Sequence, residues 1–318
     1  MNESLSKSAN RKLILIDGHA ILHRAYHALP PLTTRKGEPI NAVYGLVSML
    51  LRVIQDLKPT HLAVAFDRPE PTFRRKEFPD YQAQRPPLEN DLQVQIEKTK
   101  DVFSAMDIPI FEAPGYEADD IIGTLALQLA GTSKQLNQSR IDEVVVVTGD
   151  RDILQLVDDG KNISVYMPVK GLSAAKLMKE EDVVEKLGVK PKQIPDFKAL
   201  VGDPSDNYPG VSGIGPKTAV KLLAKYESLE SIYKHLKDLD ESTRKKLEKD
   251  KENAFRFQKL ARIVKDMEFK VDLGKLKNWR VDSQKVLDLF SEYGFKSLAK
   301  RVKEVGRSIV SENQGSLF

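Results

Sequence analysis

The sequence predicts an α/β fold, in which a doubly wound, mainly parallel sheet is followed by a smaller helical subdomain. Three short runs are apolar at almost every position: 13–16 (LILI), 62–66 (LAVAF) and 144–149 (VVVVTG). Amphipathic helical patterns lie between or beside them, at 41–57, 88–106 and 118–130. Strands that are apolar on both faces and are separated by helices indicate a parallel sheet covered on both sides.

These patterns divide the chain of 318 residues into parts. Residues 1–10 are polar and are expected to be disordered, and residues 11–185 form the α/β core. From about residue 186 the chain is lysine-rich, with short helices expected at 191–201, 216–226, 228–236 and 241–266. We therefore expect a helical subdomain at 186–304, followed by a flexible tail at 305–318.

Residues 68–90, inside the core, are basic and rich in proline, and they have no steady period. A segment of this length between regular elements is usually functional or mobile. The alternative is that it is only a solvated connector between a strand and the next helix.

The composition is that of an ordinary globular protein, with 41% hydrophobic and 30% charged residues. A net charge of +4 does not identify a partner, although segregated patches of charge would matter for a polyanion. The chain has no cysteine, which excludes disulfides, thiolate metal sites and cysteine nucleophiles. Its polar start lacks the apolar core of a signal peptide, so we expect a cytoplasmic protein.

Aspartates follow three of the predicted strands directly, as Asp17, Asp67 and Asp150. The carboxyl ends of parallel strands meet at one edge of a sheet, which is where ligands bind in such folds. The segment 115–123 (GYEADDIIG) adds three acids at the start of a predicted helix. Acids in a first turn are explained either by capping of the helix or by a metal site.

The other strand-end acids favour the metal site over capping alone. Adding the D-x-D pair after the third strand and the GDPSDN loop gives nine candidate carboxylates: Asp17, Asp67, Glu117, Asp119, Asp120, Asp150, Asp152, Asp203 and Asp206. Acids this close would repel one another unless cations neutralise them. Hard oxygen ligands select Mg²⁺ or Mn²⁺ over zinc, and so many of them suit two ions that cleave a phosphodiester. The nearby His19, His23 and His27 are interpreted as structural.

The segment 208–224 (YPGVSGIGPKTAVKLLA) matches neither the P-loop nor the dinucleotide-binding pattern. Gly213 and Gly215 precede Pro216 at a plausible first helical position, and Lys217 and Lys221 lie one helical turn apart. Glycines and a helix N-terminus let a backbone approach phosphates. The pattern therefore indicates a helix–hairpin–helix that grips nucleic acid, and the alternative is an ordinary Gly/Pro turn.

Taken together and in chain order, these motifs resemble the 5′ nuclease (flap endonuclease) family, with the 5′→3′ exonuclease domain of bacterial DNA polymerase I as the closest match. The resemblance runs from about residue 12 to about residue 300. It is carried by LIDG (15–18), RAYHALPPL (24–32), AFD (65–67), FR (73–74), GYEADD (115–120), TGDRD (148–152), GDPSDNYPGVSGIGPKTA (202–219) and LL (222–223).

The resemblance implies a magnesium-dependent nuclease for DNA replication and repair, acting on DNA with a 5′ flap, nick or free 5′ end. One metal site would use Asp17, Asp67, Glu117 and Asp119, the other would use Asp150, Asp152, Asp203 and Asp206, and Asp120 would lie between or behind them. Phosphate contacts are implied for Arg24, Arg74 and Arg85. The segment at about 68–100 would form an arch over a 5′ single strand, with Tyr81 stacking on a base. The duplex would lie on a helix–three-turn–helix at 199–226, including Gly213, Gly215, Lys217, Thr218 and Lys221, with a K⁺ ion bound by loop carbonyls.

One departure and one further likeness stand out. Where the family has Tyr-Lys-x-x-Arg at the base of the arch, this chain has Gln82 in place of the lysine. Catalysis is therefore expected with another cation, or a DNA-structure-binding protein with weakened catalysis is the alternative; cleavage of RNA is a third interpretation. The last residues, Gln314–Phe318, resemble a peptide that docks on the bacterial sliding clamp. If they bind the clamp, we expect a stand-alone nuclease, and separately we expect a monomer.

Overall fold

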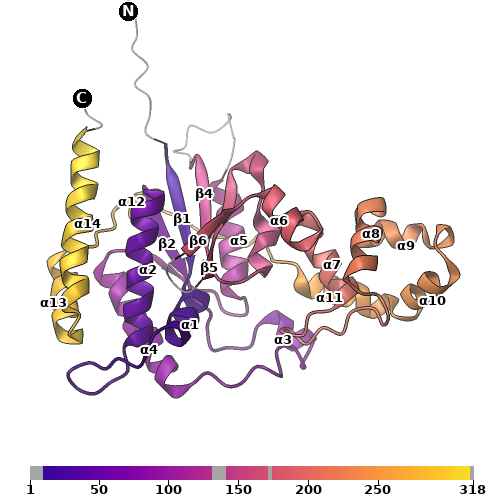
Figure 1. Ribbon diagram of the computed structural model, residues 1–318, viewed down its shortest axis with the longest axis horizontal. Helices are drawn as coiled ribbons and strands as arrows, with labels where there is room; N and C mark the ends of the chain where they lie inside the picture. Colours follow the sequence, from indigo (N-terminus) through magenta and orange to yellow (C-terminus); the bar gives the residue numbers. More distant parts are fainter. Residues whose placement is uncertain (1–9, 131–140, 171–173, 316–318) are drawn as a thin grey trace, which may run out of the picture.

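The computed structural model describes residues 10–130, 141–170 and 174–315. Its centre is a six-stranded sheet in the order β3-β2-β1-β4-β5-β6 (Figure 1). The strands are β1 (Lys12–Asp17), β2 (His61–Ala65), β3 (Ile110–Phe111), β4 (Glu143–Val147), β5 (Ile163–Lys170) and β6 (Ala174–Met178). Every pairing is parallel except that of β5 with β6. The predicted fold class, a doubly wound and mainly parallel sheet, is confirmed.

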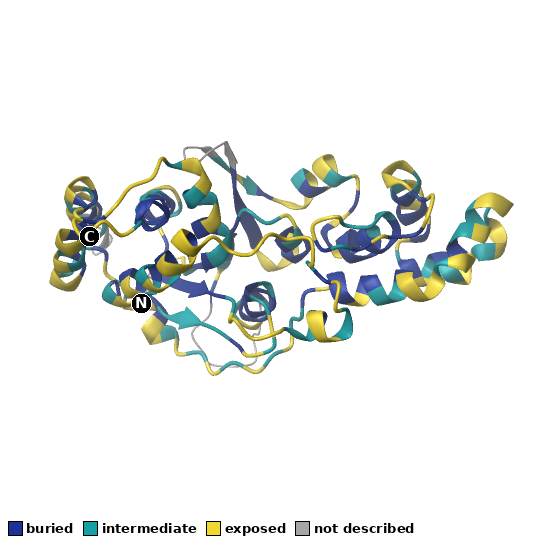
Figure 2. Cartoon of the chain, turned by 90° about the horizontal axis from the view of Figure 1, so that it is seen from below, coloured by how far each residue is buried: buried dark blue, intermediate teal, exposed yellow. Residues whose placement is uncertain are grey.

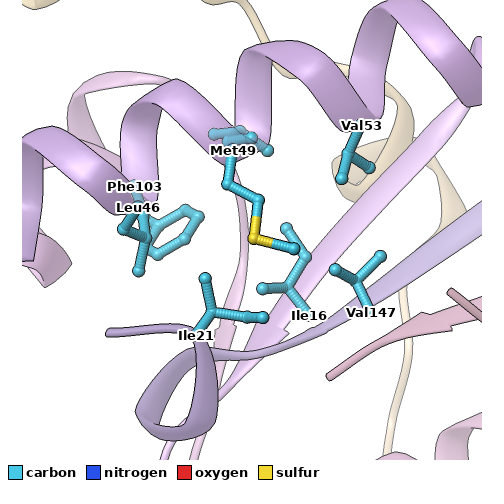
Figure 3. Close-up of a pocket in the computed structure, with 8 residues that line it drawn as sticks. Ile16, Ile21, Leu46, Met49, Val53, Phe103 and Val147 are labelled. Atoms are coloured by element: carbon cyan, nitrogen blue, oxygen red, sulfur yellow. The ribbon is translucent and has the colours of Figure 1, made fainter. Parts of the chain in front are cut away.

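Alternate residues of the central strands point to opposite faces of the sheet. Leu13 and Leu15 pack in one core with α5 (Ala118–Leu129), whereas Ile14 and Ile16 pack in a second core with α2 (Asn41–Leu57) and α4 (Asn90–Ala105). A small cavity in the second core is lined only by apolar side chains, among them Ile16, Met49 and Phe103 (Figure 3). With no polar group to orient a ligand, it is part of the packing and not a site.

The helices follow the predicted pattern closely in the middle of the chain. The predicted helix at 41–57 matches α2, and the one at 216–226 matches α8 (Pro216–Tyr226). The pattern at 241–266 is two helices, α10 (Glu241–Lys249) and α11 (Lys251–Ala261), which meet at Asp250. The remaining helices are α1 (Gly18–Ala28), α3 (Phe73–Glu77), α6 (Glu180–Leu187), α7 (Ile194–Val201), α9 (Leu229–Lys234), α12 (Leu273–Lys277), α13 (Gln284–Tyr293) and α14 (Lys296–Gly315).

The last two helices return to the sheet, so the predicted boundary of the helical subdomain at 304 is wrong. Phe290 of α13 and Leu298 and Val302 of α14 are buried in the same core as α2 and α4. The N–H of Arg280 also donates to the carbonyl of Met106, at 2.8 Å. The chain from about α12 onward therefore completes the α/β core.

The predicted flexible tail begins too early for the same reason. α14 continues to Gly315, because Leu298, Val302 and Val305 keep the spacing of one apolar helix face and bury it. Residues 1–9 and 316–318, which hold most of the predicted disordered start and the end of the predicted clamp peptide, lie outside the described residues.

The arrangement leaves one edge of the sheet for a site. The start of β1 and the end of α14 lie on one side of the molecule, whereas α1 and α3 lie at the opposite edge, where the parallel strands end (Figure 1). Buried segments extend from the sheet into the helices α7 to α11, so both parts share one core (Figure 2). In the part of the chain that the structure describes, no helix has the length and apolar character needed to span a membrane.

Candidate active site

Asp17 ends β1 and is fixed from both sides at the carboxyl edge of the sheet. Its Oδ1 accepts the N–H of Ala20 (2.9 Å), which caps α1, and its Oδ2 accepts the hydroxyl of Thr148 (2.7 Å). Burial raises the pKa of Asp17 to about 7, and the charges of Asp67 and Asp150 add to this effect. A carboxylate held in this way is rigid and in need of a cation.

Asp67, which follows β2, is tied to both neighbouring segments. Its Oδ1 accepts the N–H of Ala118 at the start of α5 (2.7 Å). Its own N–H donates to Nδ1 of His19 (3.1 Å), and burial lowers the pKa of that imidazole, so His19 is a neutral acceptor. His19 is therefore a positioning residue for Asp67, which agrees with its interpretation as structural.

Asp120, which is included among the candidate ligands, is bonded through both oxygens to other groups of the protein. It is fully buried, and its Oδ2 accepts the N–H of Glu117 (3.1 Å), which closes a capping box. Arg74 donates to both of its oxygens, at 2.7 and 2.8 Å, and the N–H of Val264 donates to Oδ1 (2.9 Å). Asp120 thus caps the first turn of α5 and pairs with Arg74.

Arg74, for which the resemblance implies a phosphate contact, has its donors bonded inside the protein. The side chain is 4% exposed, and its five N–H groups can be matched to five acceptors. Besides the two bonds to Asp120, these are Glu117 Oε2 (3.2 Å) and the carbonyls of Leu260 (2.8 Å) and Arg262 (3.1 Å). Arg74 is a structural link between α3, α5 and the end of α11.

Glu117 faces the site from the cap of α5. Its Oε1 accepts the hydroxyl of Thr72 (3.2 Å), and its Oε2 accepts Tyr81 OH (3.1 Å) as well as Arg74. Burial raises the pKa of Glu117 to about 7, against the opposing effect of Arg74.

The resemblance implies that Tyr81 stacks on a base. In this structure its ring stacks on another side chain of the protein instead. It is only 6% exposed, because its ring stacks on Tyr208 with centroids 5.8 Å apart and planes at 19°. Phe78 and Phe257 complete this aromatic cluster. The base of the predicted arch is therefore anchored to the helical part of the molecule, whereas residues 83–91 beyond it are exposed.

Asp119 is buried and lies near the negative charges of four other acids. Its pKa is raised well above the ordinary value, first by burial and then by Asp150, Asp17, Asp152 and Glu117, in that order. Among the described residues, none forms a hydrogen bond or ion pair with its carboxylate. It comes from α5, Asp17 from β1 and Asp150 from the turn after β4, so the fold brings together acids that are far apart in the sequence.

A second cluster lies beside the first. Carboxylate oxygens of Asp152, Asp203 and Asp206 lie within 4.8 Å of one another. The ammonium of Lys198, on α7, bonds to Asp152 and Asp203 and lies 3.4 Å from Oδ2 of Asp206.

In this second cluster, burial and the neighbouring charges shift the pKa of each group in opposite directions. Burial raises the pKa of Asp152 to about 7 in spite of Lys198. The pKa of Asp203 is lowered, because Lys198 and Ser205 together outweigh the effect of burial. Burial alone would lower the pKa of Lys198, but the three carboxylates raise it. Sequence reasoning missed Lys198, although a lysine inside the apolar stretch IPDFKALV just before GDPSDN was a usable signal.

The base of the arch reaches this second cluster. Gln82 Nε2 and Arg85 Nη2 each donate to Oδ1 of Asp206, at 3.1 Å, and Gln82 adopts a left-handed backbone with φ 55°. Arg85 is half exposed. Arg24 borders the turn that leads to Asp150, since a Cβ on Gly149 would lie 3.8 Å from its Nη1.

The predicted helix–turn–helix spans α7 and α8. Gly202 and Gly210 have φ of 86° and 69°, and their backbones cross so closely that a Cβ on Gly210 would lie 2.3 Å from the nitrogen of Gly202. Gly213 also has positive φ, and Gly215 caps α8 with Pro216 as its first residue. Lys217 and Lys221 are exposed and Thr218 is half-buried. These residues lie together on one turn, as predicted.

Clustered carboxylates at the carboxyl edge of a parallel sheet, beside a glycine-rich turn with exposed lysines, define a nuclease class of protein. Residues 12–188 match the profile of the 5′-3′ exonuclease N-terminal resolvase-like domain, and residues 189–284 match that of the 5′-3′ exonuclease C-terminal SAM fold. The chain therefore belongs to the 5′-3′ exonuclease family, as its motifs suggest.

Individual relatives also support membership of this family. The 5′-3′ exonuclease of Aquifex aeolicus is 37% identical over 308 residues, which cover 97% of this chain and 100% of the relative. DNA polymerase I of Caldicellulosiruptor bescii is 42% identical over 92% of this chain, but the chain spans only 33% of that polymerase. A flap endonuclease of bacteriophage T5, crystallised with DNA and metal ions, has the same fold, with a TM-score of 0.60 at 20% identity over 95% of this chain and 100% of that one.

Proposed function

We propose that this nuclease is a divalent-metal-dependent, structure-specific 5′ nuclease that hydrolyses DNA phosphodiesters as a 5′→3′ exonuclease and 5′-flap endonuclease. The proposal rests on the surroundings of Asp119. Its buried carboxylate lies near the negative charges of Asp17 and Asp150, and no described residue donates a hydrogen bond to it. A site of this kind is stable in its charged form only when cations are bound.

The donor set fits hard divalent ions such as Mg²⁺ or Mn²⁺, because the clusters offer carboxylate oxygens and no sulfur. We assign Asp17, Asp67, Glu117 and Asp119 to one ion, and Asp150, Asp152, Asp203 and Asp206 to a second. Bound metal ions would activate a water and neutralise charge on the leaving oxygen. Thr148 and His19 hold Asp17 and Asp67 in fixed orientations, and Arg24 and Arg85 are the cations available to orient a phosphate.

The proposed substrate is DNA with a 5′ flap, a nick or a free 5′ end. Exposed Lys217 and Lys221 follow the glycine turn at the start of α8, where N–H groups and lysines favour a phosphate backbone over base edges. The exposed segment 83–91 contacts Asp206 through Arg85 and is the proposed path of the 5′ strand. Replacing Lys217 by alanine should reduce the slope of log affinity against log salt by about 1.

Cleavage of a labelled 5′-flap duplex with and without Mg²⁺ tests the proposal. We expect cutting that EDTA abolishes, and a loss of about 10³-fold or more in Asp119→Asn with flap binding retained. Asp288→Asn, at an exposed position of α13 far from the acids in the sequence, is the matched control and should cut normally. An RNA 5′ strand in place of DNA tests the substrate class. Equal cutting by Asp119→Asn and the unchanged protein would refute the proposed site.

A second candidate function, a DNA-structure-binding protein with weakened catalysis, is favoured by one observation. Gln82 replaces the family's lysine and bonds to Asp206, so it brings no positive charge to the site. Flap binding at nanomolar protein concentration without any metal-dependent cutting would favour this candidate.

We propose two further ligands and a setting. Loop carbonyls between α7 and α8 would bind K⁺, and the residues Gln314–Phe318 would dock on the bacterial sliding clamp. A pull-down with the clamp, with and without the last five residues, tests the second. We expect a monomer that works in the cytoplasm at the nucleoid, which light scattering and a fluorescent fusion would check.

A further inference from the structure

Lys198 is a buried cation inside a cluster of acids. It projects from α7 with a side chain that is 11% exposed, and it contacts all three members of the cluster, Asp152, Asp203 and Asp206. An ammonium has three N–H donors and no acceptor, so one carboxylate for each donor satisfies it completely.

The cluster needs such a cation. Three carboxylates with oxygens within 4.8 Å of one another repel strongly when they are withdrawn from water. Lysine is a compact point charge on a flexible stem, whereas arginine is a planar fork. Lys198 therefore occupies the kind of position that a metal ion takes among carboxylates.

The first group of acids, Asp17, Asp67, Glu117 and Asp119, has no cation of this kind. Glu117 accepts from Arg74, but that guanidinium is shared with the buried Asp120. Among the described residues, no lysine or arginine forms an ion pair with Asp17, Asp67 or Asp119. His19, beside Asp67, is a neutral acceptor. The two halves of the site thus differ in that only the second has a cation in contact with three of its carboxylates.

We propose that Lys198 is an internal counter-ion of the Asp152–Asp203–Asp206 cluster, and that a divalent ion binds this cluster only in competition with its ammonium. The inference rests on the proposed metal sites of this nuclease. It follows that the first group fills at low metal concentration, and that the second fills only when the ion displaces Lys198 from its carboxylates. Lys198 is then a positioning residue that sets the metal concentration at which the whole site is loaded.

Metal binding without DNA tests this directly. Mn²⁺ is titrated into the full chain, and bound ion is counted by electron paramagnetic resonance and calorimetry. We expect one tight and one weak ion, and in Lys198→Met the weak ion should bind about tenfold tighter or more, because one nearby positive charge is gone. Lys198→Arg keeps the charge and should not show this gain. Lys192→Met, an exposed lysine of the same region, should bind as the unchanged protein does.

A stability measurement separates competition from a merely structural role. In EDTA, Lys198→Met should melt at a lower temperature than the unchanged protein, and Mn²⁺ should restore more of its stability than the ion adds to the unchanged protein. Unchanged affinity for both ions in a folded Lys198→Met would overturn the proposal.

If Lys198→Met does not fold, the unchanged protein gives the answer. The ¹³Cε resonance of Lys198 should move during the second step of a Mg²⁺ titration and stay in place during the first. A resonance that is unchanged at saturation would overturn the proposal. Because none of these readouts requires cleavage, a protein that shows the competition but does not cut DNA would refute only the proposed function.

Discussion

Arg74 and Asp120 form a buried ion pair joined by two parallel hydrogen bonds, Nη1 to Oδ2 at 2.7 Å and Nη2 to Oδ1 at 2.8 Å. Neither side chain exceeds 4% exposure. The pair links α3, at the base of the predicted arch, to the turn of α5 that presents Glu117 and Asp119. The geometry of the site therefore depends on two residues that do not face it.

Arg74→Met should destabilise the fold strongly, because it leaves Asp120 buried with an uncompensated charge. Removing one partner of such a pair costs about 3–5 kcal/mol. Unfolding in urea at pH 7 measures this. Arg75→Met, at the exposed neighbouring position, is the control and should change the free energy of unfolding by less than about 0.5 kcal/mol. Equal values for the two variants would contradict the structural role of Arg74.

The metal-free protein should lose stability as the pH rises. The folded pKa values of Asp17, Glu117 and Asp152 are raised to about 7, mainly by burial, whereas unfolded carboxyls titrate near pH 4. The folded state then holds more protons, so this contribution is complete below about pH 4 and is lost as the pH rises through about 7.

Melting temperatures in EDTA between pH 5 and pH 8 check the sign of this effect. Asp17→Asn removes one titrating group and should flatten the curve, and saturating Mn²⁺ should flatten it further, because the ion takes the place of the protons. A metal-free protein that gains stability over this range would rule the interpretation out.

Gln82→Lys should speed cleavage. The new ammonium would stand beside Asp206, at the edge where Arg85 already lies, and would add a charge that stabilises a phosphate in transition. We expect a single-turnover rate about tenfold higher on a flap substrate. Gln84→Lys adds the same charge two residues away, where the side chain bonds to Asn207, and should have little effect. If both variants gain equally, general charge attraction is responsible instead.

Gly210→Ala should damage the turn between α7 and α8. The positive φ of 69° alone costs a non-glycine residue about 1–3 kcal/mol, and its Cβ would also lie 2.5 Å from the carbonyl carbon of Val201. Gly215→Ala, with negative φ and open space around its Cβ, should keep the melting temperature. Thermal unfolding of the two variants compares them, and equal melting temperatures would refute the crossing of the two backbones.

The sequence was most informative where one pattern recurs along it, namely an apolar run followed by an aspartate. Asp17, Asp67 and Asp150 were predictable because each follows an all-apolar run, and parallel strands bring such ends to one edge. Residue type alone, however, does not tell which way a side chain faces. Arg74, Tyr81 and Asp120 stand in the same motifs as the other candidate residues, but they are turned into the protein and bonded there.

Other features required tertiary contacts that no local pattern contains. His19 and Thr148 act on acids 48 and 131 residues away, respectively, and Lys198 reaches Asp152 from 46 residues further along the chain. The return of α13 and α14 to the sheet was missed because their amphipathic pattern fits any apolar partner. What the sequence alone could not decide was which partner each face would find.

The packing of α14 on α2 has a consequence for how the protein is made. Leu298, Val302 and Val305 cover a core face that begins at Ile14, so segments that are far apart in the sequence meet in one hydrophobic layer. During synthesis that layer stays uncovered until α14 has left the ribosome. Contacts between such distant parts are the slow ones to form. We therefore expect the sheet and its last helices to fold together in one late, cooperative step, and ribosome-bound chains ending before α13 to remain sensitive to protease.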